Sequence, residues 1–294
     1  MKRFVIGTSV VGLLALIVAG VAASQLPAIG AGALLFPSRH VNQRIRPSVC
    51  VDRKFAAVDI TLDGWECRST NPVRRGTILY LHGIADNRGS AIGVVESLVP
   101  DGFDVIAYDS RAHGTSEGDR CTYGYLEKRD LQRVLDQVGA RDVILIGHSL
   151  GGAVALQAAA IEPRVRAVVA VSSFSDLRTI ATERAFYFPQ WSLGPAFARA
   201  ERDGHFVVDE VNPARAATDI SVPVLLIHGG EDRDTLPAHS ERVFRLLGVP
   251  KQMITVSGAG HNDVLRSEVW KQIERWISEL PAAQNLLLSG SVGR

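Results

Sequence analysis

The chain has 294 residues, about twice the roughly 150 residues of a typical domain, which allows one large domain or two ordinary ones. It carries 32 Lys and Arg against 31 Asp and Glu, a formal net charge of +1, and 46% of its residues are hydrophobic. This composition excludes a disordered chain, a collagen-like repeat and a disulfide-dense mini-protein, and the lack of a basic excess argues against a nucleic-acid partner.

The chain begins with a basic start and a long apolar run. Lys2 and Arg3 are followed by apolar and small residues from Phe4 to Ala23, and the next charged residue is Arg39. A run of this length is about long enough to cross a ~30 Å hydrocarbon core as a helix. We therefore expect residues 1–36 to be a single-pass membrane anchor with its linker, which places the rest of the chain outside the cytoplasm. A signal peptide that is cleaved near Ala23, releasing a secreted protein, is the alternative.

The three cysteines leave the redox environment of the protein open. Cys50 and Cys67 could pair if this part of the chain is exported, which would leave Cys121 over. An odd number of cysteines at irregular spacing equally suits free buried thiols.

From Phe55 onward, short β-rich runs alternate with amphipathic stretches. Near-continuous apolar runs favour strands that are buried on both faces of a parallel sheet, and their alternation with helical patterns indicates an open α/β sheet. Two short runs, at 55–62 and 65–68, lie close together and predict a leading hairpin. The later expected strands are 77–81, 104–108, 143–146, 165–171, 222–227 and 252–256, and the expected helices are 91–98, 126–138, 153–161, 240–247 and 264–280.

The interval between the strands at 165–171 and 222–227 breaks this rhythm and is rich in aromatic residues. Apolar side chains in a long insertion need something to cover, so we expect a lid at about 173–221, with Phe186, Phe188 and Trp191 as candidate substrate contacts. A plain helical packing layer is the alternative. Residues 281–294 lack sustained periodicity and are expected to be a flexible tail, which leaves 37–280 as the main domain.

The motif Gly147-His148-Ser149-Leu150-Gly151 follows a predicted strand directly and precedes a predicted helix. A G-x-S-x-G match alone is weakly specific, but this position is typical of a nucleophile on a strained turn. Glycines around the serine remove Cβ atoms that would collide there, and the N-terminus of the following helix favours developing negative charge. We therefore predict that Ser149 is a nucleophile.

A serine hydroxyl needs a base to activate it, and the base needs an acid to orient it. His261 lies in a glycine-rich loop after the last predicted strand, where its ring can reach the carboxyl edge of the sheet. Three carboxylates follow the preceding strand; Asp232 is the expected orienting acid, with Asp234 as the alternative. His82 and His228 each end a strand before a glycine, and we interpret them as structural partners of their loops.

An acyl-transfer intermediate also needs two backbone donors for its oxyanion. The N–H of Leu150, the residue after the nucleophile, is one of them. The expected second donor is the N–H of Ile84, in the loop after the strand at 77–81.

Several motifs in this order resemble the α/β-hydrolase superfamily of serine hydrolases. They are His82-Gly83, the segment Tyr108 to Ser116, the Gly147 turn, His228-Gly229-Gly230-Glu231-Asp232 and Gly258-Ala259-Gly260-His261. One turn departs from the family pattern, because Arg111-Ala112-His113-Gly114 stands where members often have Arg-Gly-x-Gly. The resemblance implies a mostly parallel eight-stranded sheet flanked by helices, with a helical lid inserted after the sixth strand. It also implies Ser149 as nucleophile, His261 as general base and Asp232 as its orienter.

The activity that this resemblance implies is hydrolysis of carboxylic esters. The expected substrate is a small, fairly apolar acyl compound, cleaved through an acyl-enzyme intermediate with no metal or organic cofactor. The same groups cleave amides, peptides and thioesters, and the sequence does not separate these bonds. A non-catalytic, membrane-anchored binding module is the remaining alternative, since fold alone does not determine function.

Overall fold

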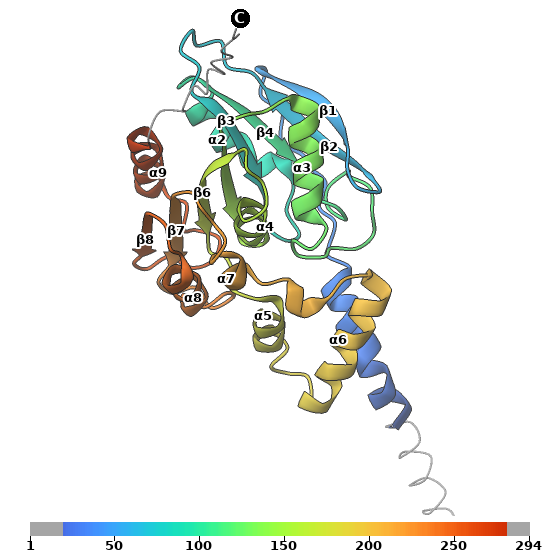
Figure 1. Cartoon of the computed structure of the whole chain (residues 1–294). Coiled ribbons are helices and arrows are strands. Elements are labelled where there is room, and N and C mark those ends of the chain that lie inside the picture. The colour runs from blue at the N-terminus through green and yellow to red at the C-terminus, as the bar shows by residue number, and fades with distance from the viewer. Residues whose placement is uncertain (1–19, 281–294) are drawn as a thin grey trace, which may run out of the picture.

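The computed structural model describes residues 20–280, and its centre is an eight-stranded sheet (Figure 1). The strands are β1 (Cys50–Ala56), β2 (Thr61–Cys67), β3 (Gly76–Leu81), β4 (Phe103–Tyr108), β5 (Val143–His148), β6 (Val165–Val171), β7 (Val224–Gly229) and β8 (Lys251–Val256). Their order across the sheet is β1-β2-β4-β3-β5-β6-β7-β8. The pairings of β2 with β1 and with β4 are antiparallel, and all the others are parallel. The mostly parallel eight-stranded sheet is therefore confirmed.

Helices cover both faces of this sheet. They are η1 (Arg88–Ala91), α2 (Ile92–Leu98), α3 (Glu127–Val138), α4 (Leu150–Ala159), α5 (Leu177–Arg184), α6 (Gln190–Gly204), η2 (Val208–Glu210), α7 (Pro213–Ala216), α8 (Ala238–Leu246) and α9 (Ser267–Glu279). Alternate residues of β3 enter two cores: Ile78 and Tyr80 share one with residues of α2 and α9, and Leu79 and Leu81 share the other with residues of α3, α4 and α8. Burial on both faces explains the near-continuous apolar runs of the strands.

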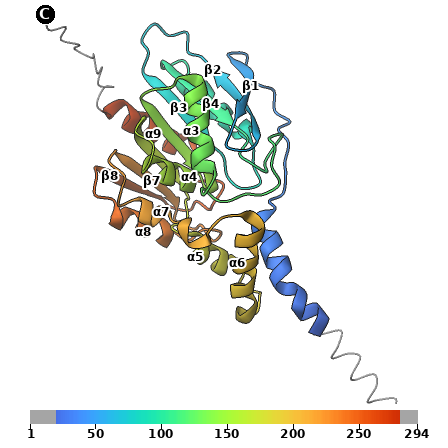
Figure 2. The ribbon, with the colours of Figure 1, turned by 45° about the vertical axis from the view of Figure 1, so that its right-hand side comes forward.

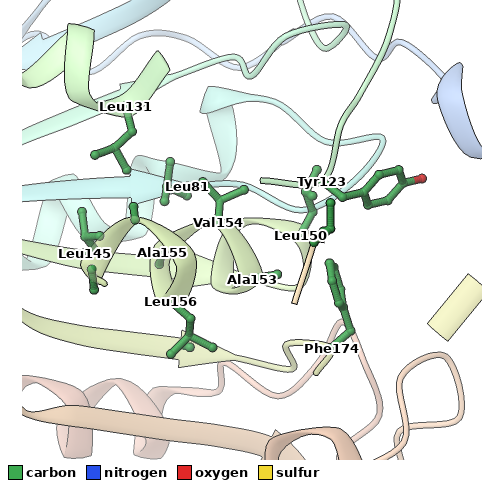
Figure 3. Close-up of a cluster of buried hydrophobic side chains, with 14 of the residues drawn as sticks. Leu81, Tyr123, Leu131, Leu145, Leu150, Ala153, Val154, Ala155, Leu156 and Phe174 are labelled. Atoms are coloured by element: carbon green, nitrogen blue, oxygen red, sulfur yellow. The ribbon is translucent and has the colours of Figure 1, made fainter. Parts of the chain in front are cut away.

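The helix α4 lies at the centre of the second core. Figure 3 shows its apolar side chains beside Leu81 and Leu131, with Tyr123 and Phe174 beyond the end at which Leu150 lies. The rings of Tyr123 and Phe174 meet edge to face, with centroids 6.3 Å apart. This core therefore continues past the first turn of α4 toward the segment that follows β6.

Two element boundaries differ from the sequence-based expectation. The run at 55–62 is not one strand, because the chain turns between β1 and β2 and the Ala57 N–H donates to the Ile60 carbonyl at 2.8 Å. The Asp130 carboxylate accepts from the Val58 N–H at 3.1 Å, and this long-range contact is invisible to a local pattern. The helix expected from residue 153 begins at Leu150, because tertiary packing overrides the low helix propensity of its two glycines.

The segment between β6 and β7 contains α5, α6, η2 and α7, and we call residues 173–221 the helical insertion. A further helix over residues 20–35 lies side by side with α6 in both views (Figures 1 and 2). Its side chains Ala31 and Leu35 are buried, and the Cys121 N–H donates to the Leu35 carbonyl at 2.9 Å. These contacts hold the C-terminal half of the helix against the body of the protein.

The expected membrane anchor falls mostly outside this description. The apolar run from Phe4 to Ala23 lies largely within residues 1–19, and the expected tail is residues 281–294, neither of which is among the described residues. Within 20–280, no helix combines the length and the hydropathy that a bilayer-spanning segment needs.

The first two strands are joined by a disulfide bond. Cys50 of β1 lies directly opposite Cys67 of β2 in the antiparallel register, and the two residues are covalently paired. Cys121 is free and buried, and burial raises the pKa of its thiol well above the ordinary value. The sequence left open whether Cys50 and Cys67 are paired or free, and in the structure they are paired.

This pairing predicts how many thiols react. Denatured protein kept away from reductant is expected to take up one equivalent of a thiol reagent, at Cys121, whereas reduced protein takes up three. Mass spectrometry of the labelled peptides locates the sites. Label on Cys50 or Cys67 in unreduced protein would contradict the pairing.

Candidate active site

Ser149 occupies a strained turn between β5 and α4. Its backbone has φ 52° and ψ −114°, a region that side-chain-bearing residues rarely adopt and that persists only where the surrounding structure enforces it. A Cβ on Gly147 would lie 2.2 Å from the Gly151 carbonyl oxygen, and one on Gly151 would lie 2.0 Å from the Leu81 carbonyl oxygen. These two positions therefore require glycine because the backbones approach each other closely.

The structure brings Ser149, His261 and Asp232 into one hydrogen-bonded line. The Ser149 hydroxyl donates to His261 Nε2 at 2.9 Å, and His261 Nδ1–H donates to Asp232 Oδ2 at 2.7 Å. Ser149 follows β5, Asp232 follows β7 and His261 follows β8, so all three lie at the carboxyl ends of parallel strands. This edge of an open α/β sheet is where ligands bind.

The Asp232 carboxylate is buried and accepts four hydrogen bonds. Its Oδ1 accepts from the N–H groups of Asp234 at 2.9 Å and Thr235 at 2.8 Å. Its Oδ2 accepts from His261 and lies 3.2 Å from His228 Nε2. Burial alone raises the pKa of this carboxyl, but the bonds from His228, His261 and Thr235 outweigh it and hold the pKa well below its usual value. The carboxylate is therefore ionised and can stabilise a positive charge on His261.

Asp234, the alternative acid, is placed differently. Its side chain is exposed. Arg184 Nε donates a hydrogen bond to the Asp234 backbone carbonyl at 3.1 Å, not to its carboxylate. Of the two aspartates, only Asp232 has a hydrogen bond to His261.

Two further histidines support the site. His228 is fully buried; its Nδ1 accepts from the Ser240 hydroxyl at 2.7 Å, and its Nε2–H points at the Thr235 carbonyl, 2.8 Å away, and at Asp232. His148 donates from Nε2 to the His261 carbonyl at 3.0 Å. Burial lowers the pKa of His148, so the ring is neutral at pH 7. The sequence marked His228 only as a loop partner and assigned no role to His148. The bond from His148 to the His261 carbonyl joins loops that are distant in the chain, whereas His228 is brought to Asp232 by the fold of the loop after β7.

The two residues predicted to supply the oxyanion donors, Leu150 and Ile84, line one cavity with Ser149. The Leu150 N–H belongs to the first turn of α4, where no carbonyl of the helix itself is available to it. Ile84 lies in the loop after β3 and lines a cavity together with Ser149 and Leu150. That loop is held by His82, which donates from Nδ1 to the Gly83 carbonyl at 2.7 Å and accepts from the Ser110 N–H at 2.9 Å.

Two cavities of different character contact Ser149. A polar cleft of about 920 Å³ is lined by the serine, by His261 and by charged residues that include Arg44 and Asp86. A narrow cavity of about 40 Å³ has mainly apolar walls and also contacts the serine. Within residues 20–280, no group of His, Cys, Asp or Glu is arranged to hold a metal ion. The groups present at Ser149 are those of nucleophilic acyl transfer.

The three aromatic residues expected to contact substrate separate in the structure. Phe188 lines an apolar chamber beside the narrow cavity. Phe186 and Trp191 are 81% and 58% exposed and line neither the cleft nor the chamber, contrary to expectation. The reason is the helical phase of α6, whose buried stripe runs through Leu193 and Phe197 and leaves Trp191 outside it.

A second serine and histidine are in contact elsewhere in the structure, and comparison with them shows which features are particular to Ser149. Ser175 Oγ lies 2.8 Å from His239 Nδ1, and His239 Nε2 lies 2.9 Å from Glu183. Ser175 is fully buried and lines neither the cleft nor the narrow cavity. Access and a strained turn therefore distinguish Ser149 from a serine with similar neighbours.

Comparison of the sequence with protein families and with other proteins identifies its relatives. A family model described as alpha/beta hydrolase fold matches residues 76–209. The chain is 31% identical over 223 residues to the uncharacterized protein YfhR of Escherichia coli K12, covering 71% of this chain and 72% of that protein. It is 28% identical over 197 residues to the uncharacterized protein YqkD of Bacillus subtilis, covering 63% of this chain and 64% of that protein.

Among solved structures, the Pyrococcus furiosus esterase Pf2001 superposes with a TM-score of 0.68 at 21% identity, covering 83% of this chain and 97% of that one. The Pyrococcus horikoshii acylaminoacyl peptidase superposes with a TM-score of 0.63 at 15% identity, covering 79% of this chain and 42% of that one. At these identities the likeness establishes a shared fold.

The hydrogen bonds predict which aspartate matters. Asp232→Asn removes the charge that stabilises protonated His261, so the rate at which a fluorophosphonate probe labels Ser149 should fall on the order of 10⁴-fold, the loss seen when the aspartate of a triad becomes asparagine. The matched variant Asp234→Asn should label within a few-fold of the wild type, because its carboxylate does not contact His261. Equal losses in both folded variants would contradict the assignment.

Proposed function

Because the chain belongs to the α/β-hydrolase family, we propose that it is a serine hydrolase that cleaves carboxylic esters of a fairly apolar acyl group. The observation that carries this proposal is the unbroken line from Ser149 Oγ through His261 to the buried, ionised Asp232. Such a line activates a hydroxyl that is otherwise a weak nucleophile at neutral pH.

The reaction proceeds in two halves. In the first, Ser149 Oγ attacks the acyl carbonyl while His261 Nε2 takes its proton, and the oxyanion accepts hydrogen bonds from the N–H groups of Leu150 and Ile84. The C–O bond to the alcohol then breaks, and His261 returns the proton to the leaving oxygen. In the second half, water attacks the acyl-enzyme carbonyl while His261 Nε2 takes a proton from it. The bond between the acyl carbon and Ser149 Oγ then breaks, His261 returns the proton to Oγ, and the carboxylic acid leaves.

The cavities at the serine support an apolar acyl group in the substrate, and an ester is the simplest acyl compound that fits this proposal. The apolar walls of the narrow cavity suit a hydrocarbon acyl group, and the helical insertion, which supplies part of these walls, acts as the lid. Amides, peptides and thioesters remain substrates that the same groups can attack. Comparing kcat/KM for an ester, a thioester and an amide of one acyl group separates these bonds.

The protein is placed outside the cytoplasm in this proposal, held by the apolar run from Phe4 to Ala23. The bond between Cys50 and Cys67 supports this placement, since disulfides persist mainly in oxidising compartments. Cleavage of the run would give a secreted protein instead.

Protease treatment of intact cells tests on which side of the membrane the body of the protein lies. Protease added outside should digest the body of the protein, detected with an antibody against the 37–280 region, while a cytoplasmic marker survives. A body that resists until the cells are lysed would contradict the extracytoplasmic placement.

The central prediction concerns Ser149. The wild type should hydrolyse 4-nitrophenyl butyrate and be labelled by a fluorophosphonate, and Ser149→Ala should lose at least about 10³-fold in kcat and all labelling. Ser175→Ala is the matched control, because it removes the buried hydroxyl beside His239. A folded wild type without labelling or turnover would refute the hydrolase assignment and favour a binding module.

A further inference from the structure

An apolar chamber opens from the nucleophile toward the N-terminal helix. The narrow cavity at Ser149 shares five lining residues with a chamber of about 240 Å³: Leu34, Ile84, Tyr123, Ala181 and Arg184. The shared walls make the two cavities neighbours, so a group bound to Ser149 Oγ can extend into the chamber. The narrow cavity is therefore the neck of the chamber.

One wall of the chamber belongs to the helix over residues 20–35. Gly30, Ala33 and Leu34 line it, opposite residues of the helical insertion that include Leu193 and Phe197. The region that matches the family model begins at residue 76, so this wall is supplied by a segment that precedes it. The pocket is thus built from two parts of the chain that are far apart in sequence.

The wall is fixed by close contacts on both sides. Tyr123 Oη donates to the Leu34 carbonyl at 2.9 Å, directly at the neck. A Cβ on Gly30 would lie 3.0 Å from the Ala196 Cβ, and one on Gly204 would lie 2.7 Å from a methyl of Leu35. The helix therefore packs against α6 at glycine positions, which brings Leu34 to the neck.

The lining of the chamber identifies its occupant. It is almost entirely aliphatic and aromatic, and its one charged residue, Arg184, is bonded through Nε to the Asp234 carbonyl and through Nη2 to Thr235 Oγ1. By proportion with a ~150 Å³ cavity that accepts benzene, about 240 Å³ accommodates roughly eight to ten carbon atoms. The polar cleft that also reaches Ser149, with Arg44 and Asp86 in its lining, suits a polar leaving group.

We propose that the helix over residues 20–35 determines acyl-chain selectivity: it forms one wall of a chamber that binds a linear, medium-length acyl chain, while the alcohol of the ester occupies the polar cleft. This inference rests on the proposed hydrolase function. Leu34 is its key residue, because its side chain lies at the neck through which the chain must pass.

The test changes the width of the neck in both directions. We expect kcat/KM of the wild type for 4-nitrophenyl esters, from acetate to palmitate, to peak near eight carbons. Leu34→Trp should block the neck and lower the octanoate-to-acetate ratio of kcat/KM on the order of tenfold or more, within the range that a few methylenes contribute. Leu34→Ala should move the optimum to longer chains. A loss of stability alone cannot shift the optimum in opposite directions.

Ile29→Ala is the matched control, since Ile29 is on the same helix but 54% exposed and lines neither cavity. Its chain-length profile should equal that of the wild type. Ala185→Phe, just after α5, narrows the chamber without touching the neck and should also favour short chains, which keeps the proposal testable if Leu34→Trp does not fold.

The outcomes separate this inference from the proposed function. If all variants hydrolyse esters and take up the fluorophosphonate with one unchanged chain-length profile, the acyl chain does not use the chamber and the inference is refuted while the hydrolase stands. A wild type that favours acetate over every longer ester refutes it in the same way. If the wild type neither hydrolyses esters nor takes up the probe, the proposed function fails and the inference fails with it.

Discussion

The contact between α4 and β3 at Gly151 is the constraint on which the site depends. A side chain at this position would strike the Leu81 carbonyl, so the first turn of α4 can approach the sheet only because the residue is glycine. This approach leaves Ser149 no helical or extended conformation, and its backbone takes positive φ. The hydroxyl is thereby presented at the edge of the sheet, and the Leu150 N–H is presented beside it. One steric requirement positions both the nucleophile and an oxyanion donor.

Buried histidines hold the loops around the nucleophile in place. His82 joins the loop after β3 to the loop after β4, and His148 holds the backbone of His261. Burial lowers the pKa of both rings, so each is neutral at pH 7 and serves as one donor and one acceptor of fixed direction. Among the histidines of residues 20–280, only His261 both lies between a hydroxyl and a carboxylate and lines the polar cleft at Ser149. Histidine therefore has a structural role at positions 82 and 148 and a chemical role at position 261, and its neighbours decide which.

The two sides of Ser149 differ in polarity, and this asymmetry gives the proposed reaction a direction. In the proposed reaction, the acyl carbons enter a chamber whose lining is apolar except for Arg184, and the leaving group occupies a cleft lined by arginine, aspartate and asparagine side chains. The helix over residues 20–35 and the helical insertion together form the apolar side. A segment outside the matched family region can therefore change what the enzyme accepts without changing how it reacts.

The sequence by itself determined the sheet class, the nucleophile turn and the order Ser149, Asp232, His261, because each depends on short-range rules: burial on both faces of a strand, missing Cβ atoms at a tight turn, and loops that follow consecutive parallel strands. Tertiary structure decided the rest. The pairing of Cys50 with Cys67 required the register of β1 and β2, and the role of His148 required a contact between loops 113 residues apart in the chain. His228 lies only four residues before Asp232, but the approach of the two side chains depends on how the loop after β7 folds. Trp191 faces solvent and Leu34 lines the neck because burial on a helix depends on what packs against it, and that partner is chosen only when the whole chain folds.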